Sequence, residues 1–291
     1  MGVPATSDDG LLVLRHGEAR LVLDADHGGA IREFRCRGRD ILRPTPAGAG
    51  KDPLDLACFP MVPFVNRIAR GRFEFGGREV QLANNAPQIA HPIHGEGWRR
   101  QWTVTQIAPD NARLEFEGGG GKWPWRYLAE QHFALGPDTL SIELSAENLG
   151  VEPMPLMLGL HPYFIGASRT RLLAGVPKVW HTDQAALPTE LAAAPPDWGF
   201  DPARALKNLA LDHCFASWNG TATLYGPQGT LHLQATNCRF LHIYVPEGQD
   251  FFCLEPQTAA TGALGRGGAE VEAVLPGERR AMSLRINVGT P

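Results

Sequence analysis

Glycine and proline interrupt this chain so often that convincing amphipathic helices are scarce. The 291 residues include 33 Gly and 24 Pro, and between them lie short runs rich in β-branched and aromatic side chains, which favour strands. Eight of these runs are TVTQI (103–107), RLEFE (113–117), QHFAL (131–135), LSIELSA (140–146), ATLYG (222–226), LHLQA (231–235), FLHIYV (240–245) and SLRINV (283–288). Several alternate apolar with polar residues, as strands with one buried face do. The pattern predicts an all-β fold, a large sandwich of antiparallel strands.

The strand pattern lapses in one place, over residues 181–208. Four prolines in this segment, the last of them Pro202, would break any helix. We interpret the segment as a long excursion rather than a linker, because no change in composition marks a domain boundary. With 43% hydrophobic residues the chain can bury a sizeable core. We therefore expect a single domain over residues 1–291.

The charge pattern argues against nucleic acid as a partner. The formal net charge is −4 at pH 7, and no run of five or six like charges suggests a surface that follows phosphates. The first residues, MGVPATSDDGLLVLRHG, lack the basic and then apolar segments of a signal peptide. No stretch approaches eighteen consecutive apolar residues, as a membrane span would. We expect no membrane partner and predict a cytoplasmic protein.

The cysteines are consistent with that compartment. They form an odd set without C-x-x-C spacing, as expected of reduced thiols in a cytosolic chain. The set is Cys36, Cys58, Cys214, Cys238 and Cys253. We expect neither a disulfide scaffold nor a zinc knuckle.

The stretch HPIHGEGW (91–98) raises the question of a metal site, since His91 and His94 lie three positions apart. The pair lacks an H-E-x-x-H frame, and Pro92 disfavours a helix that would put both on one face. The H-x-E half of a zinc deaminase signature is present without its P-C-x-x-C half. The glycines of EGGGGKW (117–123) do not match a phosphate-binding loop and predict a hairpin turn. The sequence therefore predicts no metal at this pair and no phosphate-binding loop.

Four other stretches place polar residues among Pro, Gly and aromatic residues at the ends of apparent strands. The stretches are PFVNRIARGRFEFGG (63–77), LGLHPYF (158–164), LDHCF (211–215) and CLEPQT (253–258). A proline follows both His161 and Glu255, which biases the two residues towards extended or turn geometry. Each side chain can then project from a strand end into a cleft, as convergent catalytic groups do.

With these motifs in this order, the chain resembles the aldose 1-epimerase (galactose mutarotase) family. The motifs, in chain order, are NRIARGRFEFGG, IHGEGW, LGLHPYF, LDHCF, LEPQT and a terminal PGERRAMSLRINV. The resemblance implies an antiparallel β-supersandwich with an open sugar-binding cleft. It also implies action on free aldoses without a metal or an organic cofactor. By the same resemblance Glu255 is the general base and His161 the general acid.

The resemblance further implies which residues hold the sugar. Arg67, His94 and Asp212 would bind sugar oxygens, with Asn66 as a further contact, whereas His91 has no such role. Two positions depart from the family pattern. Glu96 stands where a second Gly often follows His-Gly, and His242 stands where many members have Gln. We expect both changes to alter which sugar hydroxyls are recognised, with His242 as a substrate contact. Candidates for an apolar platform under the sugar ring are Trp98, Trp102, Trp123 and Trp125.

The chemistry of anomer exchange explains a carboxylate and an imidazole in one site. A cyclic aldose opens when its anomeric hydroxyl loses a proton and its ring oxygen receives one. We expect the base and the acid on opposite sides of this centre. With unperturbed pKa values of about 4.3 for Glu and about 6.5 for His, Glu255 can be ionised while His161 is protonated only near neutral pH.

Three other functions stay open from the sequence. A mutarotase of hexose 6-phosphates could use the basic cluster of Arg70, Arg72 and Arg78 for phosphate. A glycoside hydrolase could use Glu255 with Asp212 as its two carboxylates. A non-catalytic carbohydrate-binding or sensor protein would need Arg67 but not a paired acid and base. The preferred aldose is not predicted, and the protein is expected to be a monomer or a homodimer.

Overall fold

The computed structural model describes residues 5–6, 10–46, 48–49 and 52–289. In this part of the chain nearly all regular structure is β-strand. Neighbouring strands pair antiparallel in each of the three large sheets. The predicted all-β, antiparallel class is confirmed.

The largest sheet has nine strands within the described residues. They are β9 (Thr103–Ile107), β10 (Asn111–Gly118), β11 (Tyr127–Leu135), β12 (Thr139–Asn148), β16 (Arg171–Ala174), β19 (Phe200–Ala205), β21 (Thr221–Gly226), β22 (Gly229–Thr236) and β26 (Arg279–Val288). Their order across the sheet is β19-β16-β21-β22-β26-β12-β11-β10-β9. Every second residue of β11 is buried, from Tyr127 to Leu135, so the sheet has one face on the core.

A second sheet carries the candidate site and has eight strands in the described part of the chain. They are β6 (Pro60–Met61), β14 (Gly159–Leu160), β15 (Tyr163–Ile165), β17 (Lys178–Thr182), β18 (Pro188–Ala193), β20 (Leu211–Ala216), β23 (Phe240–Val245) and β24 (Phe251–Gln257). Their order is β18-β17-β20-β23-β24-β14-β6, and β15 also pairs with β24. The strand β24 therefore lies in the interior of this sheet.

The remaining elements are an N-terminal sheet, two small ladders and short 3-10 helices. The N-terminal sheet runs in chain order through β1 (Ala5–Thr6), β2 (Leu12–His16), β3 (Ala19–Asp24), β4 (Ala30–Cys36) and β5 (Arg39–Asp40). The ladders pair β7 (Arg72–Phe75) with β8 (Arg78–Gln81) and β13 (Met154–Leu156) with β25 (Glu272–Val274). The 3-10 helices are η1 (Pro53–Asp55), η2 (Ala69–Gly71), η3 (Gly97–Arg99), η4 (Ala167–Arg169), η5 (Pro196–Trp198) and η6 (Leu264–Arg266).

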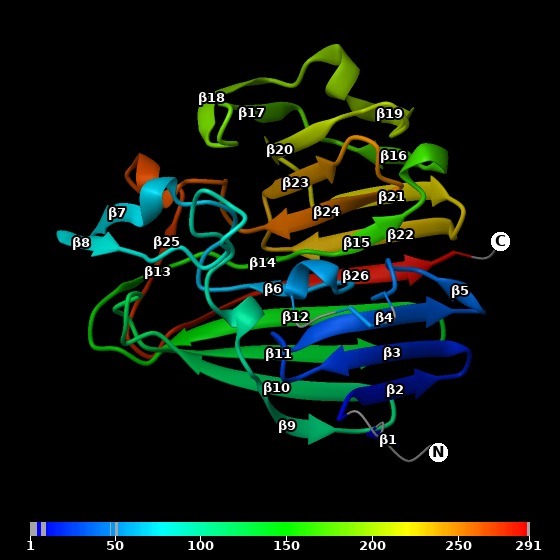
Figure 1. The fold of residues 1–291 in the computed structure, drawn as a ribbon, viewed down its shortest axis with the longest axis horizontal. Coiled ribbons are helices and arrows are strands. Elements are labelled where there is room, and N and C mark those ends of the chain that lie inside the picture. Colours follow the sequence, from blue (N-terminus) through cyan, green and yellow to red (C-terminus); the bar gives the residue numbers. More distant parts are fainter. Residues whose placement is uncertain (1–4, 7–9, 47, 50–51, 290–291) are drawn as a thin grey trace.

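The sheets stack as a long sandwich. In Figure 1 the nine-stranded sheet extends from β9 at the bottom to β16 and β19 near the top, with the N-terminal sheet (blue) against its lower half. Buried amides join the sheets. Gln131 of β11 donates to the carbonyl of Gly28 at 3.2 Å, and Gln228 donates to the carbonyl of Ile165 in β15 at 2.7 Å. Both bonds satisfy backbone acceptors at points where two sheets meet.

All eight strand-type runs of the sequence lie in strands. They fall in β9, β10, β11, β12, β21, β22, β23 and β26. The segment 181–208 differs from the prediction, because it contains two strands, β18 and β19. Both are the outermost strands of their sheets. An edge strand has one unpaired side, so it tolerates Pro188 and Pro202, which cannot donate a ladder hydrogen bond.

Two compositional expectations can be compared with the structure. All five cysteines are buried and unpaired. Among the residues that the structure describes, no helix is long and apolar enough to cross a membrane.

The segment around Gly95 holds the candidate site in place by a very close backbone contact. Gly95 forms a parallel bridge with Val62, and the N–H groups of Glu96 and Gly97 both donate to the Val62 carbonyl, at 3.0 Å and 3.1 Å. Gly95 has φ +73°, and a Cβ there would overlap the Val62 carbonyl oxygen. Only glycine meets both requirements.

We expect Gly95→Ala to lower the free energy of unfolding by about 3 kcal/mol or more, because left-handed strain and a backbone overlap add together. The matched control is Gly77→Ala, since Gly77 has φ +75° with no atom within 4 Å of an added Cβ. It should cost only about 1 kcal/mol. Urea unfolding followed by circular dichroism measures both, and equal losses would contradict the close-contact argument.

Candidate active site

The residues selected from the sequence line one cavity of about 320 Å³, near the lower end of the size range of small-molecule sites. All seven contribute: Asn66, Arg67, His94, His161, Asp212, His242 and Glu255. The rest of the lining is Arg43, Leu54, Ile89, Ile93, Tyr163, Tyr244 and Phe251. The cavity thus combines convergent polar groups with an apolar wall, as ligand sites do.

The order of strands in the eight-stranded sheet positions the site residues that lie on β20, β23 and β24. Asp212 lies on β20, His242 on β23 and Glu255 on β24, which are neighbours in that order. His242 is directly opposite Glu255 in the ladder. On the other side of β24, Tyr163 of β15 pairs with Cys253, and His161 lies between β14 and β15. Adjacent strands are about 4.8 Å apart, so these side chains form a row.

Two loops complete the site from the opposite direction. Arg67 forms an antiparallel bridge with Ile93, and the N–H of His94 donates to the carbonyl of Asn66 at 3.1 Å. Asn66 and His94 both have positive φ, 49° and 60°. Asn tolerates this region, whereas for His the conformation stores strain of about 1–3 kcal/mol. Such strain is common at binding sites, where the surroundings hold the residue in place.

Glu255 and His161 form a close, buried pair at ion-pair distance. His161 Nε2 lies 3.1 Å from Glu255 Oε1, and the two side chains are only 7% and 2% exposed. Gln257, which is fully buried, donates to the other carboxyl oxygen at 3.1 Å. The acid and the base predicted on opposite sides of the anomeric centre therefore lie side by side. This arrangement suits two oxygens that are bonded to the same carbon.

Burial changes the proton affinity of both partners. It raises the pKa of Glu255 to about 7, although nearby His242 opposes the shift. Burial also lowers the pKa of His161 to about 3, and His242 adds to that effect. With the ordinary pKa values of Glu and His, a single proton shared by the pair would lie on His161. In the cavity, the single proton that the pair holds between these pKa values lies on Glu255.

His161 is held by aromatic rings on its faces. Its ring stacks on Phe59 at 4.5 Å and on Tyr163 at 4.7 Å between centroids. His161 Nδ1 is buried without a partner, and Nε2 lies 3.1 Å from the Glu255 carboxylate. Position and orientation are both fixed before any ligand binds.

Asn66, Arg67, Asp212 and His242 form a closed ring of hydrogen bonds, here termed the Asp212 network. Asp212 accepts from His242 Nε2 at 2.7 Å and from Arg67 at 3.2 Å. The Asn66 oxygen accepts from the Arg67 backbone N–H at 2.9 Å and from its guanidinium at 3.2 Å. The Asn66 amide nitrogen faces His242 Nδ1 at 3.2 Å and closes the ring. His242 and Arg67 hold the pKa of Asp212 well below its usual range, despite burial.

The charge state of His242 is coupled to the Asn66 amide. Burial disfavours a charged ring, but the Glu255 and Asp212 carboxylates outweigh it and raise the pKa of His242 to about 10. A second proton on Nδ1 would face the Asn66 amide nitrogen, and turning that amide would break two bonds to Arg67. A charged His242 therefore requires the Asn66 amide to turn, whereas Nε2–H donates to Asp212 in both charge states.

The two histidines of HPIHGEGW have different surroundings. His94 lines the cavity and contacts Trp98 and His161 edge to face. Burial, followed by the charges of neighbouring groups, lowers the pKa of His94 well below its usual value. It is thus a neutral ring that can hydrogen-bond a hydroxyl. His91 lies outside the cavity, where its Nδ1 accepts from the Arg70 backbone N–H at 3.2 Å.

Two expectations about the cavity wall are wrong. Glu96 does not line the cavity; its carboxylate accepts from the Gly119 N–H at 2.8 Å and from the Tyr127 hydroxyl at 3.1 Å. It ties the loop to the β10–β11 hairpin and does not face this cavity. The four tryptophans proposed as a platform are buried outside the cavity, because the core takes their large apolar surface.

The basic cluster considered for phosphate also lies elsewhere. Arg72 pairs with Glu79 at 2.9 Å and Arg78 with Glu152 at 3.1 Å, all with exposed side chains. Arg70 is exposed as well, and none of the three arginines lines the cavity. The arrangement gives this cluster no access to a ligand in the cavity.

One group within the described residues has the spacing of a metal site. The ligand atoms of His161, Cys253 and Glu255 lie within 4.8 Å of one another. Burial, and next the Glu255 carboxylate, raise the pKa of the Cys253 thiol well above its usual value. A thiol must lose its proton to bind a metal, so this group fits a metal poorly.

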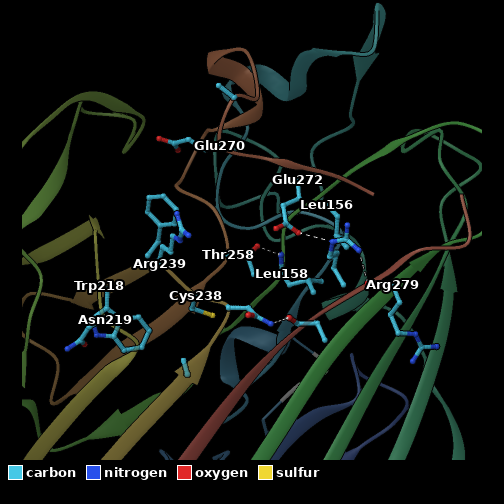
Figure 2. Close-up of a pocket in the computed structure, with 16 residues that line it drawn as sticks. Leu156, Leu158, Trp218, Asn219, Cys238, Arg239, Thr258, Glu270, Glu272 and Arg279 are labelled. Atoms are coloured by element: carbon cyan, nitrogen blue, oxygen red, sulfur yellow. Dashed lines mark hydrogen bonds and ion pairs between the residues drawn. The ribbon is translucent and has the colours of Figure 1, made fainter. Parts of the chain in front are cut away.

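A larger hollow of about 870 Å³ lies at another part of the sandwich, between the ends of β22, β23 and β26. Figure 2 shows Leu156, Leu158, Trp218 and Thr258 on its walls. Most of its charged residues have ion-pair partners, as Arg280 has in Glu272 at 3.3 Å. None of the sequence-selected residues lines it. Size alone therefore does not identify the functional site.

Sequence reasoning missed several residues at the smaller cavity. The missed lining residues with polar or aromatic side chains are Arg43, Tyr163, Tyr244 and Phe251. Tyr163 stands in LGLHPYF, and Gln257, which contacts Glu255, stands in LEPQT, so the motifs themselves contained a signal for these two. Arg43, in ILRPTP, had none.

Comparison with known proteins assigns the family. The sequence model of the aldose 1-epimerase family matches residues 10–287. The chain is 34% identical over 291 residues to the uncharacterized protein YphB of Escherichia coli (strain K12), covering 95% of this chain and 98% of that protein. The chain belongs to the aldose 1-epimerase family.

Solved structures agree with this assignment. A crystal structure of a candidate aldose 1-epimerase from Escherichia coli K12 has a TM-score of 0.90 and 31% identity, covering 97% of this chain and 99% of that one. A galactose mutarotase-like protein from Clostridium acetobutylicum has a TM-score of 0.84 at 21% identity, covering 97% and 95%. The latter shows the fold alone. The predicted β-supersandwich of the galactose mutarotase type is confirmed.

We expect Gln257→Leu to raise the pKa of Glu255 above its value in the unaltered protein, because the lost hydrogen bond stabilised the carboxylate. The matched control is Gln228→Leu, another buried amide, which bonds Ile165 and not Glu255. Carbon-13 NMR titration of the glutamate carboxyls measures the shift. An unchanged Glu255 titration in a folded Gln257→Leu protein would show that the amide does not support the carboxylate.

Proposed function

We propose that this protein is an aldose 1-epimerase that interconverts the α and β anomers of a free aldose. Glu255 is the general base and His161 the general acid. The observation that carries the proposal is the buried Glu255–His161 pair, with 3.1 Å between Oε1 and Nε2, at a cavity that also holds the Asp212 network. A binding or sensor protein has no need of such a pair, since it would only add buried polar groups to be satisfied.

The pair can carry out ring opening without other reagents. In its singly protonated state, transfer of the proton from Glu255 to His161 gives an ionised Glu255 and a protonated His161. Glu255 then takes the proton of the anomeric hydroxyl while the bond from carbon 1 to the ring oxygen breaks. The ring oxygen receives the proton of His161, and the anomeric oxygen becomes the aldehyde carbonyl. Rotation about the bond between carbons 1 and 2, followed by the reverse transfers, closes the other anomer.

Sugar hydroxyls are held by the Asp212 network and His94. The carboxylate of Asp212 accepts from hydroxyls, the guanidinium of Arg67 donates to them, and His94 can do either. Asn66 and His242 orient Asp212 and Arg67 and supply further contacts. This chemistry uses neither a metal nor an organic cofactor. We propose that it is performed by a single domain over residues 1–291, in the cytoplasm, by a monomer or a homodimer.

Glu255→Gln and His161→Ala should each reduce kcat by about 10²- to 10⁴-fold. Gln keeps the shape of Glu255 but cannot accept a proton, and Ala removes the donor to the ring oxygen. Polarimetry of freshly dissolved α-anomers of glucose, galactose, arabinose and xylose measures the rate and also identifies the preferred aldose. A near-normal rate for Glu255→Gln would show that the proposed base is wrong.

The histidine pair of HPIHGEGW supplies a control for the same assay. His94→Ala should lower kcat/KM, because it removes a hydroxyl contact from the cavity. His91→Ala, three residues away and outside the cavity, should keep the kcat of the unaltered protein, provided that circular dichroism shows a folded chain. Equal losses in the two variants would mean that His94 acts through the fold and not through the sugar.

The pH profile should follow the single proton of the pair. Because the pKa of Glu255 is raised to about 7, the pair is protonated once below that pH and loses this proton above it. A neutral His161 that donated its proton would be left as an anion, so kcat/KM should fall about tenfold per pH unit above about pH 7. Polarimetry between pH 5 and 9, with the buffer-catalysed rate subtracted, tests this. A rate that rises through pH 7 would contradict it.

A further inference from the structure

Arg43 is a cation in the cavity wall without a carboxylate partner. It lines the same cavity as Glu255 and His161, and among the described residues no Asp or Glu lies within ion-pair distance of it. By contrast, Arg67, the other arginine of the wall, is paired with Asp212. A partly buried charge without a counter-charge is costly, which makes Arg43 the unexplained group of the site.

The protein holds this guanidinium firmly. One terminal nitrogen donates to the carbonyls of Leu54 and Leu56, at 2.7 Å and 3.2 Å. The guanidinium carbon lies 3.9 Å from the Tyr163 ring centroid and 4.7 Å from that of Phe251. The Nε atom is buried without a partner. These contacts fix the position of the guanidinium, and none of them is with a negatively charged group.

The order of residues along the wall defines which part of a sugar meets Arg43. His161 Nε2 lies 3.1 Å from Glu255 Oε1. The Tyr163 ring stacks on the His161 ring with 4.7 Å between the centroids, and the guanidinium of Arg43 lies over the Tyr163 ring. The Asp212 network lies on the other side of Glu255, on β23 and β20. If His161 serves the ring oxygen, the next sugar atom in the direction of Arg43 is carbon 5, which carries carbon 6.

We propose that Arg43 binds an anionic carbon 6 group, and that the preferred substrates are hexuronic acids, aldoses with a carboxylate at that carbon. This inference rests on the proposed function and names its substrate class. One guanidinium matches the single charge of a carboxylate, to which it also donates charge-assisted hydrogen bonds. A phosphate carries about −1.5 to −2 charges at pH 7, and its excess charge would face Glu255 and Asp212.

The test compares matched sugars that differ only at carbon 6. Anomer exchange is followed by NMR exchange spectroscopy for glucose and glucuronate, and for galactose and galacturonate, with glucose 6-phosphate as a third arm. In the unaltered protein, kcat/KM should be about tenfold or more higher for at least one hexuronate than for its hexose. This ratio decides the proposal without any variant.

Variants then assign the preference to one residue. Arg43→Gln should lower the kcat/KM of the hexuronate to about that of its hexose, and Arg43→Lys should retain part of the advantage. The matched control is Arg99→Gln, because Arg99 also stacks on an aromatic ring, Trp98, at 4.1 Å but lies outside the cavity. It should leave the ratio unchanged.

The outcomes separate this inference from the proposed function. Equal or faster exchange of neutral hexoses, a preference for the 6-phosphate, or an Arg43→Gln variant that loses both sugars alike would overturn the role of Arg43 and leave the epimerase proposal intact. No exchange with any aldose would overturn the proposed function itself.

Discussion

The backbone ladder of the eight-stranded sheet sets the distances on which the whole site depends. Asp212, His242 and Glu255 lie on three successive strands, so the two carboxylates are separated by two strand spacings, about 9.6 Å at the backbone. His242 stands between them and hydrogen-bonds Asp212 at 2.7 Å. Two carboxylates in direct contact could not both ionise. The ladder lets Asp212 remain charged while Glu255 exchanges a proton.

The loops add what the sheet cannot supply. His161 and Arg67 approach from segments outside the long strands, and their placement requires unusual backbone at Asn66, His94 and Gly95. Each of these left-handed residues lies at or next to a bridge or hydrogen bond between the two loops. The cost of this conformation is offset by the surrounding core, which holds Phe59 against His161. The strained backbone of the loops and the core that offsets its cost therefore lie next to each other.

The sequence predicted what depends on local pattern and missed what depends on distant contacts. Strand alternation is local, so all eight runs were found, whereas β18 was missed because prolines on an edge strand look like a break. The motifs predicted seven lining residues of the cavity. They could not predict that Glu96 turns towards Tyr127 or that Arg43 meets Tyr163, far along the chain. Burial is likewise invisible in sequence, and it moves the pKa of Glu255 to about 7.

The closed Asp212 network determines how a sugar can be recognised. Each carboxylate oxygen has about two acceptor sites, and Asp212 already accepts one bond from His242 and one from Arg67. One site on each oxygen is left for a hydroxyl, in directions that the two existing bonds define. A Gln in place of His242 could also donate to Asp212, but its amide has both donor and acceptor atoms and can turn. The imidazole, fixed by Asn66 on its other nitrogen, restricts Asp212 to one orientation, so recognition here depends on geometry prepared before the sugar binds.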